Sequence, residues 1–390
     1  MPNWAVIACD QFTSQPEYWR NVAEISGEAP SAYNLIIPES ELECANDSDI
    51  AKKISRVNSQ MKNYIEAGIF HTYENCYIYV ERTLLNGEIR RGIVGVIDLE
   101  EYDYRPGKFS RIRATEKTVS ERIPTRKKIR ENALLELSHV ILLCDDPEKN
   151  LIESVTLVKN NLRRIYDFDL MLNGGNIRAW LLDGKFAESF DERMQNYIAA
   201  KKAKSLTFAV GDGNHSLAAA KACYLENPEK ISRYATVELE NIHDDALKFE
   251  PIHRIVKNIQ PEKFLENMRS KICDESSDLF LKYYYANESG ILRLKKNHGA
   301  SVLNILQNFL DEELTRENNF EIDYIHDLDA LKKLSNEDGN LGFEMPEFSK
   351  SGFFDAIEES GTLPRKTFSM GHAQEKRYYI EARIIRKACD

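Results

Sequence analysis

The chain has 390 residues, 42% of them hydrophobic, which is enough for two hydrophobic cores. Its formal net charge of -11 argues against a surface built for extended contact with nucleic acid or anionic lipid. No segment approaches the roughly 20 apolar residues of a membrane span, and the first residues lack the basic start of a signal peptide. We therefore expect a cytoplasmic protein with two domains that binds neither nucleic acid nor membranes.

The first half of the chain predicts a helix followed by two β-hairpins. Apolar residues recur every three or four positions from Asp47 to Ala67, which is typical of an amphipathic helix. Residues 76–83 and 89–99 are rich in β-formers and flank Asn86-Gly87, a strong hairpin signal. A second hairpin is expected at 173–176, with its return strand at 177–182 and a helix at about 188–202.

The second half continues the alternation of strands and helices. We expect a strand at 205–210, a helix at 217–225 and a strand at 234–239. A helix should follow Pro261, then a strand at 279–285, a helix at 302–314 and a last strand at 377–385. Gln260-Pro261 suggests a boundary, giving domains of residues 1–259 and 260–390. The expected fold class is mixed α/β, with β-hairpins and flanking helices.

The cysteines predict neither disulfides nor a zinc site. There are seven of them, an odd number, and no two form a CxxC pair. We expect free thiols at Cys9, Cys44, Cys76, Cys144, Cys223, Cys273 and Cys389.

The stretch Gly211-Asp212-Gly213-Asn214-His215-Ser216 stands between the strand at 205–210 and the helix at 217–225. A strand-to-helix turn directs backbone N–H groups and the positive end of the helix dipole at one point, which suits a phosphate or carboxylate. Gly211 and Gly213 would allow positive φ, Asn214 or Ser216 would cap the helix, and His215 would bind a phosphoryl oxygen or move a proton. The alternative is an ordinary turn, since glycine, aspartate and asparagine favour turns in general.

A second candidate is the basic segment 111–137. If it is helical from about Pro124, Arg126 and Arg130 lie on one face, with Arg122 just before the start. Like charges four residues apart destabilise an isolated helix, so a bound phosphate would relieve them. The alternative is a solvated face paired with nearby acids.

Four motifs give the chain a family resemblance. The segments "DQFTSQPEYW", "RATEKT", "VGDGNHSLAAAK" and "FEPIHRIV" together resemble the bacterial family called domain of unknown function 1015, over nearly the whole chain. A more distant resemblance links the chain to the superfamily of ParB, sulfiredoxin and the free serine kinases. That resemblance implies a ParB/sulfiredoxin-like core around the strand-turn-helix, with a C-terminal α/β part.

The distant resemblance also implies roles for residues. Glu116 matches the catalytic glutamate of the first motif, while Asp212, Gly213 and His215 match the phosphate-binding second motif. Three positions depart from the pattern: Thr115 stands in place of a histidine, Asn214 in place of another, and Ser216 in place of an arginine. The phosphate clamp is therefore incomplete. Either another cation completes it, with Arg122, Arg126 and Arg254 as the candidates, or the activity has been altered or lost. The expected nucleotide-binding set also includes Gly211, Gly213, Asn214, Ser216, Thr115 and Lys117.

These residues together favour a phosphotransferase. ADP or ATP with magnesium would bind at the turn, with Asp212 as a metal ligand, and a small hydroxyl metabolite such as serine would accept the phosphoryl group beside Glu116. The alternative is a non-catalytic nucleotide or metabolite sensor that uses the same turn, and the substituted clamp residues favour it. A ParB-like DNA-binding role is disfavoured by the net charge. The motifs carry no information on the oligomeric state.

Overall fold

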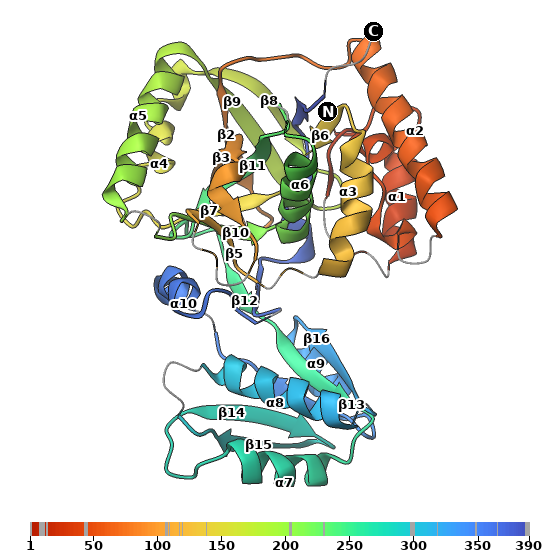
Figure 1. The fold of residues 1–390 in the computed structure, drawn as a ribbon, viewed down its shortest axis with the longest axis vertical. Coiled ribbons are helices and arrows are strands. Elements are labelled where there is room, and N and C mark those ends of the chain that lie inside the picture. Colours follow the sequence, from red (N-terminus) through yellow and green to blue (C-terminus); the bar gives the residue numbers. More distant parts are fainter. Residues whose placement is uncertain are drawn as a thin grey trace. The chain divides into compact units, whose positions relative to one another are not determined.

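The structure, a computed structural model, forms two compact units. It describes residues 2–7, 12, 15–42, 46–105, 108, 110–116, 118, 120–137, 139–202, 205–228, 231–296, 301–317, 319–347, 349–364 and 366–386. The first unit comprises Met1–Lys248, Phe353–Thr362 and Met370–Asp390, and the second comprises Phe249–Gly352 and Leu363–Ser369. Each unit is described separately below. The mixed α/β fold class expected from the sequence is confirmed (Figure 1).

The first unit is built on a nine-stranded sheet. Its strands, in spatial order, are β4 (Tyr102–Asp103), β5 (Ile112–Ala114), β10 (Phe208–Asp212), β7 (Ile141–Cys144), β11 (Tyr234–Asn241), β3 (Ile89–Asp98), β2 (Tyr77–Thr83), β9 (Asn176–Leu182) and β8 (Arg163–Asp169). Strand β5 runs parallel to both β4 and β10, and β7 runs parallel to β11. The remaining neighbours are antiparallel.

Both hairpins predicted from the sequence are confirmed. Strands β2 and β3 pair from Ile78↔Val94 to Thr83↔Ile89 around Asn86-Gly87, where Gly87 has φ of 83°. Strands β8 and β9 form the second hairpin. Side chains alternate between the two faces of the sheet, so Val80 and Tyr79 of β2 belong to different hydrophobic clusters. Each face of the sheet therefore carries a hydrophobic cluster.

Seven α-helices can be assigned among the described residues of the first unit, the last of which is α10 (Phe353–Ser360). One hydrophobic cluster takes its helical residues from α1 (Pro16–Ser26) and α2 (Asp47–Glu66). The other includes residues of α4 (Glu153–Thr156), α5 (Gly184–Ala200) and α6 (Asn214–Glu226). Helix α3 (Ile123–Glu131) packs against α6. Helix α5 begins at Gly184, four residues before the start predicted at about Glu188.

Helix α10 belongs to the first unit, residues 363–369 belong to the second, and the chain rejoins the first unit at Met370. The single strand predicted at 377–385 is two short strands instead. Strand β19 (Tyr378–Tyr379) pairs with β1 (Val6–Ile7), and β20 (Ala382–Ile384) pairs with β6 (Leu135–Leu137). The strand is interrupted because its two halves pair with different partners.

The second unit contains a five-stranded antiparallel sheet in the order β15 (Glu288–Arg293), β14 (Phe280–Tyr285), β17 (Leu341–Glu344), β13 (His253–Lys257) and β16 (Glu321–Ile325). Helices α7 (Pro261–Ile272), α8 (Val302–Glu317) and α9 (Leu328–Ser335) accompany it, and β12 (Phe249–Pro251) pairs with β18 (Phe368–Met370). The domain boundary expected at residue 259 does not coincide with the boundaries of these units. Strand β13, which precedes it, is an inner strand of the second sheet, and the last residues of the chain rejoin the first unit.

The structure describes four of the seven cysteines. Cys76, Cys144, Cys223 and Cys273 are free thiols, while Cys9, Cys44 and Cys389 lie outside the described residues. None of the helices that the structure describes combines the length and apolar character required to span a bilayer.

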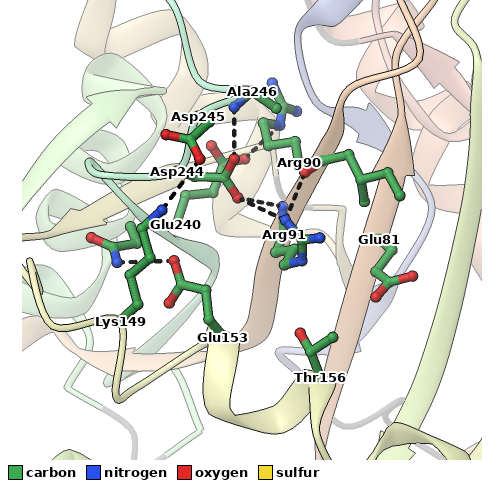
Figure 2. A network of polar contacts seen from close by, with 12 residues as sticks. Glu81, Arg90, Arg91, Lys149, Glu153, Thr156, Glu240, Asp244, Asp245 and Ala246 are labelled. Carbon is green, nitrogen blue, oxygen red and sulfur yellow. Dashed lines mark hydrogen bonds and ion pairs between the residues drawn. The ribbon is translucent and has the colours of Figure 1, made fainter.

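A buried ionic network lies on strands β3 and β11 of the first unit (Figure 2). Arg90 Nε lies 3.1 Å from Glu240 Oε1, and both side chains are at least 96% buried. Asp244 accepts hydrogen bonds from the backbone N–H groups of Arg91 at 3.1 Å and Ala246 at 2.8 Å. Burial raises the pKa of Glu240 above its ordinary value, and Glu238 and Asp244 add to this effect against the attraction of Arg90.

The raised pKa of Glu240 predicts how stability depends on pH. The folded state keeps this proton to a higher pH than the unfolded state, so the free energy of unfolding should fall as pH rises above the ordinary glutamate pKa. Glu240→Gln should flatten that decline between pH 5 and pH 8 in chemical denaturation. Glu188→Gln, at an exposed position on α5, should keep the wild-type slope. An unchanged slope in Glu240→Gln would contradict the assignment.

Candidate functional site

The predicted strand-turn-helix is present at the end of β10, with shifted bounds. The strand begins at Phe208 rather than Ser205 and continues through Gly211 and Asp212. Gly213 is therefore the single residue between strand and helix, and α6 begins at Asn214, within two residues of Ser216 as predicted. Gly213 occupies the N-cap position without a side-chain hydrogen bond, so the capping role expected of Asn214 or Ser216 is wrong.

Two glycines allow the chain to turn here. Gly213 has φ of 83° and ψ of 22°, a left-handed conformation that residues with a Cβ atom rarely adopt. A Cβ atom at Gly211 would lie 2.5 Å from Met370 Sδ, and one at Gly213 would lie 3.0 Å from Val140 Cα. A register shift between Val210 and Asp212 against β7 accompanies this close packing.

The loop containing Glu116 lies beside this turn. Strands β5 and β10 are parallel neighbours, with Ala114 opposite Val210, so the residues that follow each strand lie at the same edge of the sheet. Thr115 Oγ1 donates a 2.8 Å hydrogen bond to Val210 O and ties the two strand ends together across 95 positions of sequence. Glu116, the next residue, is half-buried. Lys117 lies outside the described residues.

Asp212, the last residue of β10, is an ionised carboxylate close to the first turn of α6. Its Oδ1 accepts a 2.8 Å hydrogen bond from the Gly213 N–H, and its Oδ2 lies 3.2 Å from Lys376 Nζ. Burial alone would raise the pKa of Asp212. Electrostatic attraction to Lys376 and His139, together with these hydrogen bonds, outweighs burial, so the pKa is lowered below its ordinary value. A carboxylate is therefore present at neutral pH, and its side chain is 33% exposed.

His139 was missed by the sequence analysis. Its Nε2 lies 3.3 Å from Ser216 Oγ, and its Nδ1 lies 3.1 Å from the hydroxyl of Tyr379. His139 precedes β7, Ser216 lies in the first turn of α6 and Tyr379 lies in β19, so three distant segments meet here. No local pattern marks His139, because its place depends on the pairing of β7 with β10.

A cavity of about 170 Å³ adjoins this group. His139, Ser216 and Tyr379 line it together with Arg126 of the predicted basic helix. The remaining lining residues are Leu35, Ile36, Ile37, Leu42, Met61, Ile129, Arg130, Ala133, Leu135, Glu136, Leu137, Val140, Leu217, Ala219, Ala220, Ala235 and Ile385. The cavity therefore combines a largely apolar wall with a polar end beside the first turn of α6.

The predicted cations have different locations. Arg126 reaches the cavity, and its Nη1 donates to Arg122 O at 3.3 Å, while Arg122 itself is exposed at the start of α3. Arg130 is bound by Glu136 at 2.5 Å. Arg254 lies in the second unit, where it is fully buried and its guanidinium lies 5.2 Å from the centre of the Tyr324 ring.

Two further predicted residues lie in the first turn of α6. His215 is half-buried there. The Oδ1 atom of Asn214 is buried and has no hydrogen-bond donor within the described part of the chain. The described residues contain no group of three or more acidic, histidine or cysteine side chains arranged to hold a metal ion.

A model of the family described as a protein of unknown function, DUF1015, matches residues 1–331. The chain belongs to this family. The membership expected from the four motifs is thereby confirmed. No curated protein matches the DUF1015 chain.

Solved structures similar to the DUF1015 chain have low sequence identity to it. A free serine kinase in complex with AMP is 9% identical, with a TM-score of 0.41 over 73% of this chain and 90% of that one. SbnI from Staphylococcus aureus, with a C-terminal truncation, is 9% identical, with a TM-score of 0.38 over 71% and 82%. A conserved hypothetical protein from Pyrococcus furiosus is 11% identical, with a TM-score of 0.38 over 73% and 93%. These similarities assign no activity to the DUF1015 chain.

The packing around Gly213 predicts an unusually large effect of a small substitution. Gly213→Ala must adopt positive φ, which costs about 1–2 kcal/mol, and its Cβ must also displace Val140, which costs about 1–3 kcal/mol more. Gly68→Ala is the matched control, because Gly68 has φ of 65° but open space around a Cβ atom. Urea denaturation should show the larger loss for Gly213→Ala. Equal losses would mean that Val140 does not restrict the turn.

Proposed function

We propose that the protein binds a nucleoside diphosphate or triphosphate at the turn between β10 and α6 and transfers a phosphoryl group to a small hydroxyl metabolite. The observation that carries the proposal is the parallel pairing of β5 with β10. It brings the Thr115-Glu116 loop and the first turn of α6 to one edge of the sheet. A phosphotransferase needs both a phosphate-binding element and a group that orients the nucleophile.

The first turn of α6 is the proposed phosphate-binding element. An α-helix leaves the N–H groups of its first turn without carbonyl acceptors in the helix, and the first such bond here joins Leu217 N to Gly213 O at 3.0 Å. These N–H groups and the helix dipole attract anions. Arg126, which lines the adjoining cavity, adds positive charge. Gly211 and Gly213 let this turn form against Met370 and Val140.

Glu116 is the proposed base that accepts the proton from the hydroxyl group. It is the second residue after β5, directly beyond the Thr115 hydroxyl that is bound to β10. Serine is the leading acceptor, and this choice rests on the resemblance of the first motif to the free serine kinases. A positioned base typically contributes about 10²- to 10⁴-fold to the rate.

Magnesium is the proposed metal ion. It would supply charge neutralisation between the nucleotide phosphates and the protein. Asp212 is the carboxylate suited to hold it, because it is ionised, partly exposed and adjacent to the first turn of α6. The Asp212 carboxylate would repel a phosphate bound at the first turn of α6, and magnesium would offset that repulsion together with Lys376. One carboxylate combined with phosphate oxygens is a common magnesium environment in kinase sites.

Glu116→Gln tests the proposed base. The variant keeps the size of the side chain and loses its charge, so affinity for Mg·ADP should stay within about twofold while phosphate transfer falls by about 10²- to 10⁴-fold. Transfer from ATP to serine and homoserine would be measured with purified protein. Glu188→Gln, at an exposed position of α5, is the control that should leave both quantities unchanged. Equal turnover in Glu116→Gln and wild type would remove Glu116 from the mechanism.

His215→Ala tests the other half of the site. Loss of this first-turn side chain should weaken Mg·ADP binding measured by calorimetry, because His215 is proposed to contact a phosphoryl oxygen. Normal ADP affinity in the variant would place the nucleotide elsewhere. If wild-type protein binds ADP but transfers no phosphate to any acceptor tested, the function would be that of a nucleotide sensor.

A further inference from the structure

Lys376 brings a positive charge to the candidate site from the end of the chain. Its side chain is only 11% exposed, and its Nζ atom lies 3.2 Å from Asp212 Oδ2, at the carboxyl end of β10. Residue 376 lies beyond residues 1–331, the part matched by the family model. Its position near Asp212 arises because the chain returns to the first unit after residue 369.

Two buried arginines fix the backbone that carries Lys376. Arg82 Nη1 donates to the carbonyls of Glu375 at 2.9 Å and Lys376 at 2.6 Å, and its Nη2 donates to the carbonyl of Gln374. Arg90 Nη1 donates to the carbonyl of Glu375 at 2.8 Å. Both arginines are 4% exposed. Buried guanidinium groups are unfavourable unless their donors are satisfied, so these bonds strongly favour one position of the segment.

The residues on either side of Lys376 are also held. Arg377 forms ion pairs with Glu238 and with Glu381, the latter at 2.6 Å. Glu375 Oε2 accepts a 3.0 Å hydrogen bond from the backbone N–H of His372. An ammonium group on a segment held from both sides is preorganised, which is the condition for a charge that binds a ligand without first being ordered.

We propose that Lys376 contacts the phosphate of the bound nucleotide and supplies the positive charge that Ser216 does not provide. This inference rests on the proposed function and adds a phosphate-contacting residue to that site. A lysine ammonium group has three donors, so it can bind the Asp212 carboxylate and a phosphate oxygen together. The alternative is that Lys376 only neutralises Asp212, and the two roles predict different results.

Binding of ADP without metal separates the two roles. In EDTA, Asp212 has no metal to hold, so Asp212→Asn should bind ADP more tightly than wild type because a negative charge has been removed. Lys376→Met should bind about 10- to 100-fold more weakly than wild type, as expected for loss of a charged hydrogen bond. Lys376→Arg should retain most of the affinity.

The double variant decides between the roles. If Lys376 contacts phosphate, Asp212→Asn with Lys376→Met should bind ADP about 10-fold or more weakly than Asp212→Asn alone. Equal affinities of these two variants would show that Lys376 acts only on Asp212 and would overturn the inference. The double variant removes both members of the ion pair, so it leaves no unpaired charge to oppose folding.

Controls separate this inference from the proposed function. Lys248→Met removes an exposed lysine of the same unit, which pairs with Glu88 at 3.1 Å, and should leave ADP affinity unchanged. Thermal unfolding without ligand checks that each variant is folded. Absence of ADP binding by wild-type protein, with and without magnesium, would overturn both the inference and the proposed function. Wild-type affinity in a folded Lys376→Met variant would overturn the inference alone.

Discussion

The parallel contact between β5 and β10 is the constraint on which the candidate site depends. Ala114 lies opposite Val210, and Thr115 Oγ1 donates to the carbonyl of Val210 at 2.8 Å. Because parallel strands end at the same edge of a sheet, Glu116 and the first turn of α6 are brought together there. The left-handed Gly213 then starts the helix directly after β10. The parallel pair and this turn place a carboxylate loop beside a helix N-terminus.

The charges around the turn are balanced by residues from other parts of the first unit. Asp212 would make the start of α6 unfavourable for an anion, but Lys376 compensates its charge at 3.2 Å. His139 lies between Ser216 and Tyr379, and Arg126 lines the adjoining cavity. Arg82 and Arg90 hold the backbone that carries Lys376. The proposed phosphate site thus depends on the sheet, on α3 and on the returning C-terminal segment.

Local signals in the sequence were sufficient for the elements but not for the whole site. The Asn86-Gly87 hairpin, α2 and the strand-turn-helix at Gly213 were predicted because their signals lie within a few adjacent residues. His139, Lys376 and Tyr379 were not predicted, because only the pairing of distant strands brings them to the turn. The same long-range pairing explains why the unit boundary was expected at 259 and why the last strand was expected to be continuous.

A crystal structure of the protein with Mg·ADP would show whether nucleotide binds at the turn between β10 and α6. We expect the terminal phosphate to lie within hydrogen-bonding distance of the backbone N–H groups of Asn214 to Ser216, with the Glu116 carboxylate facing the same space. Arg254 should keep its contacts within the second unit. Nucleotide bound at another place in the chain, or Glu116 directed away from the phosphate, would contradict the account.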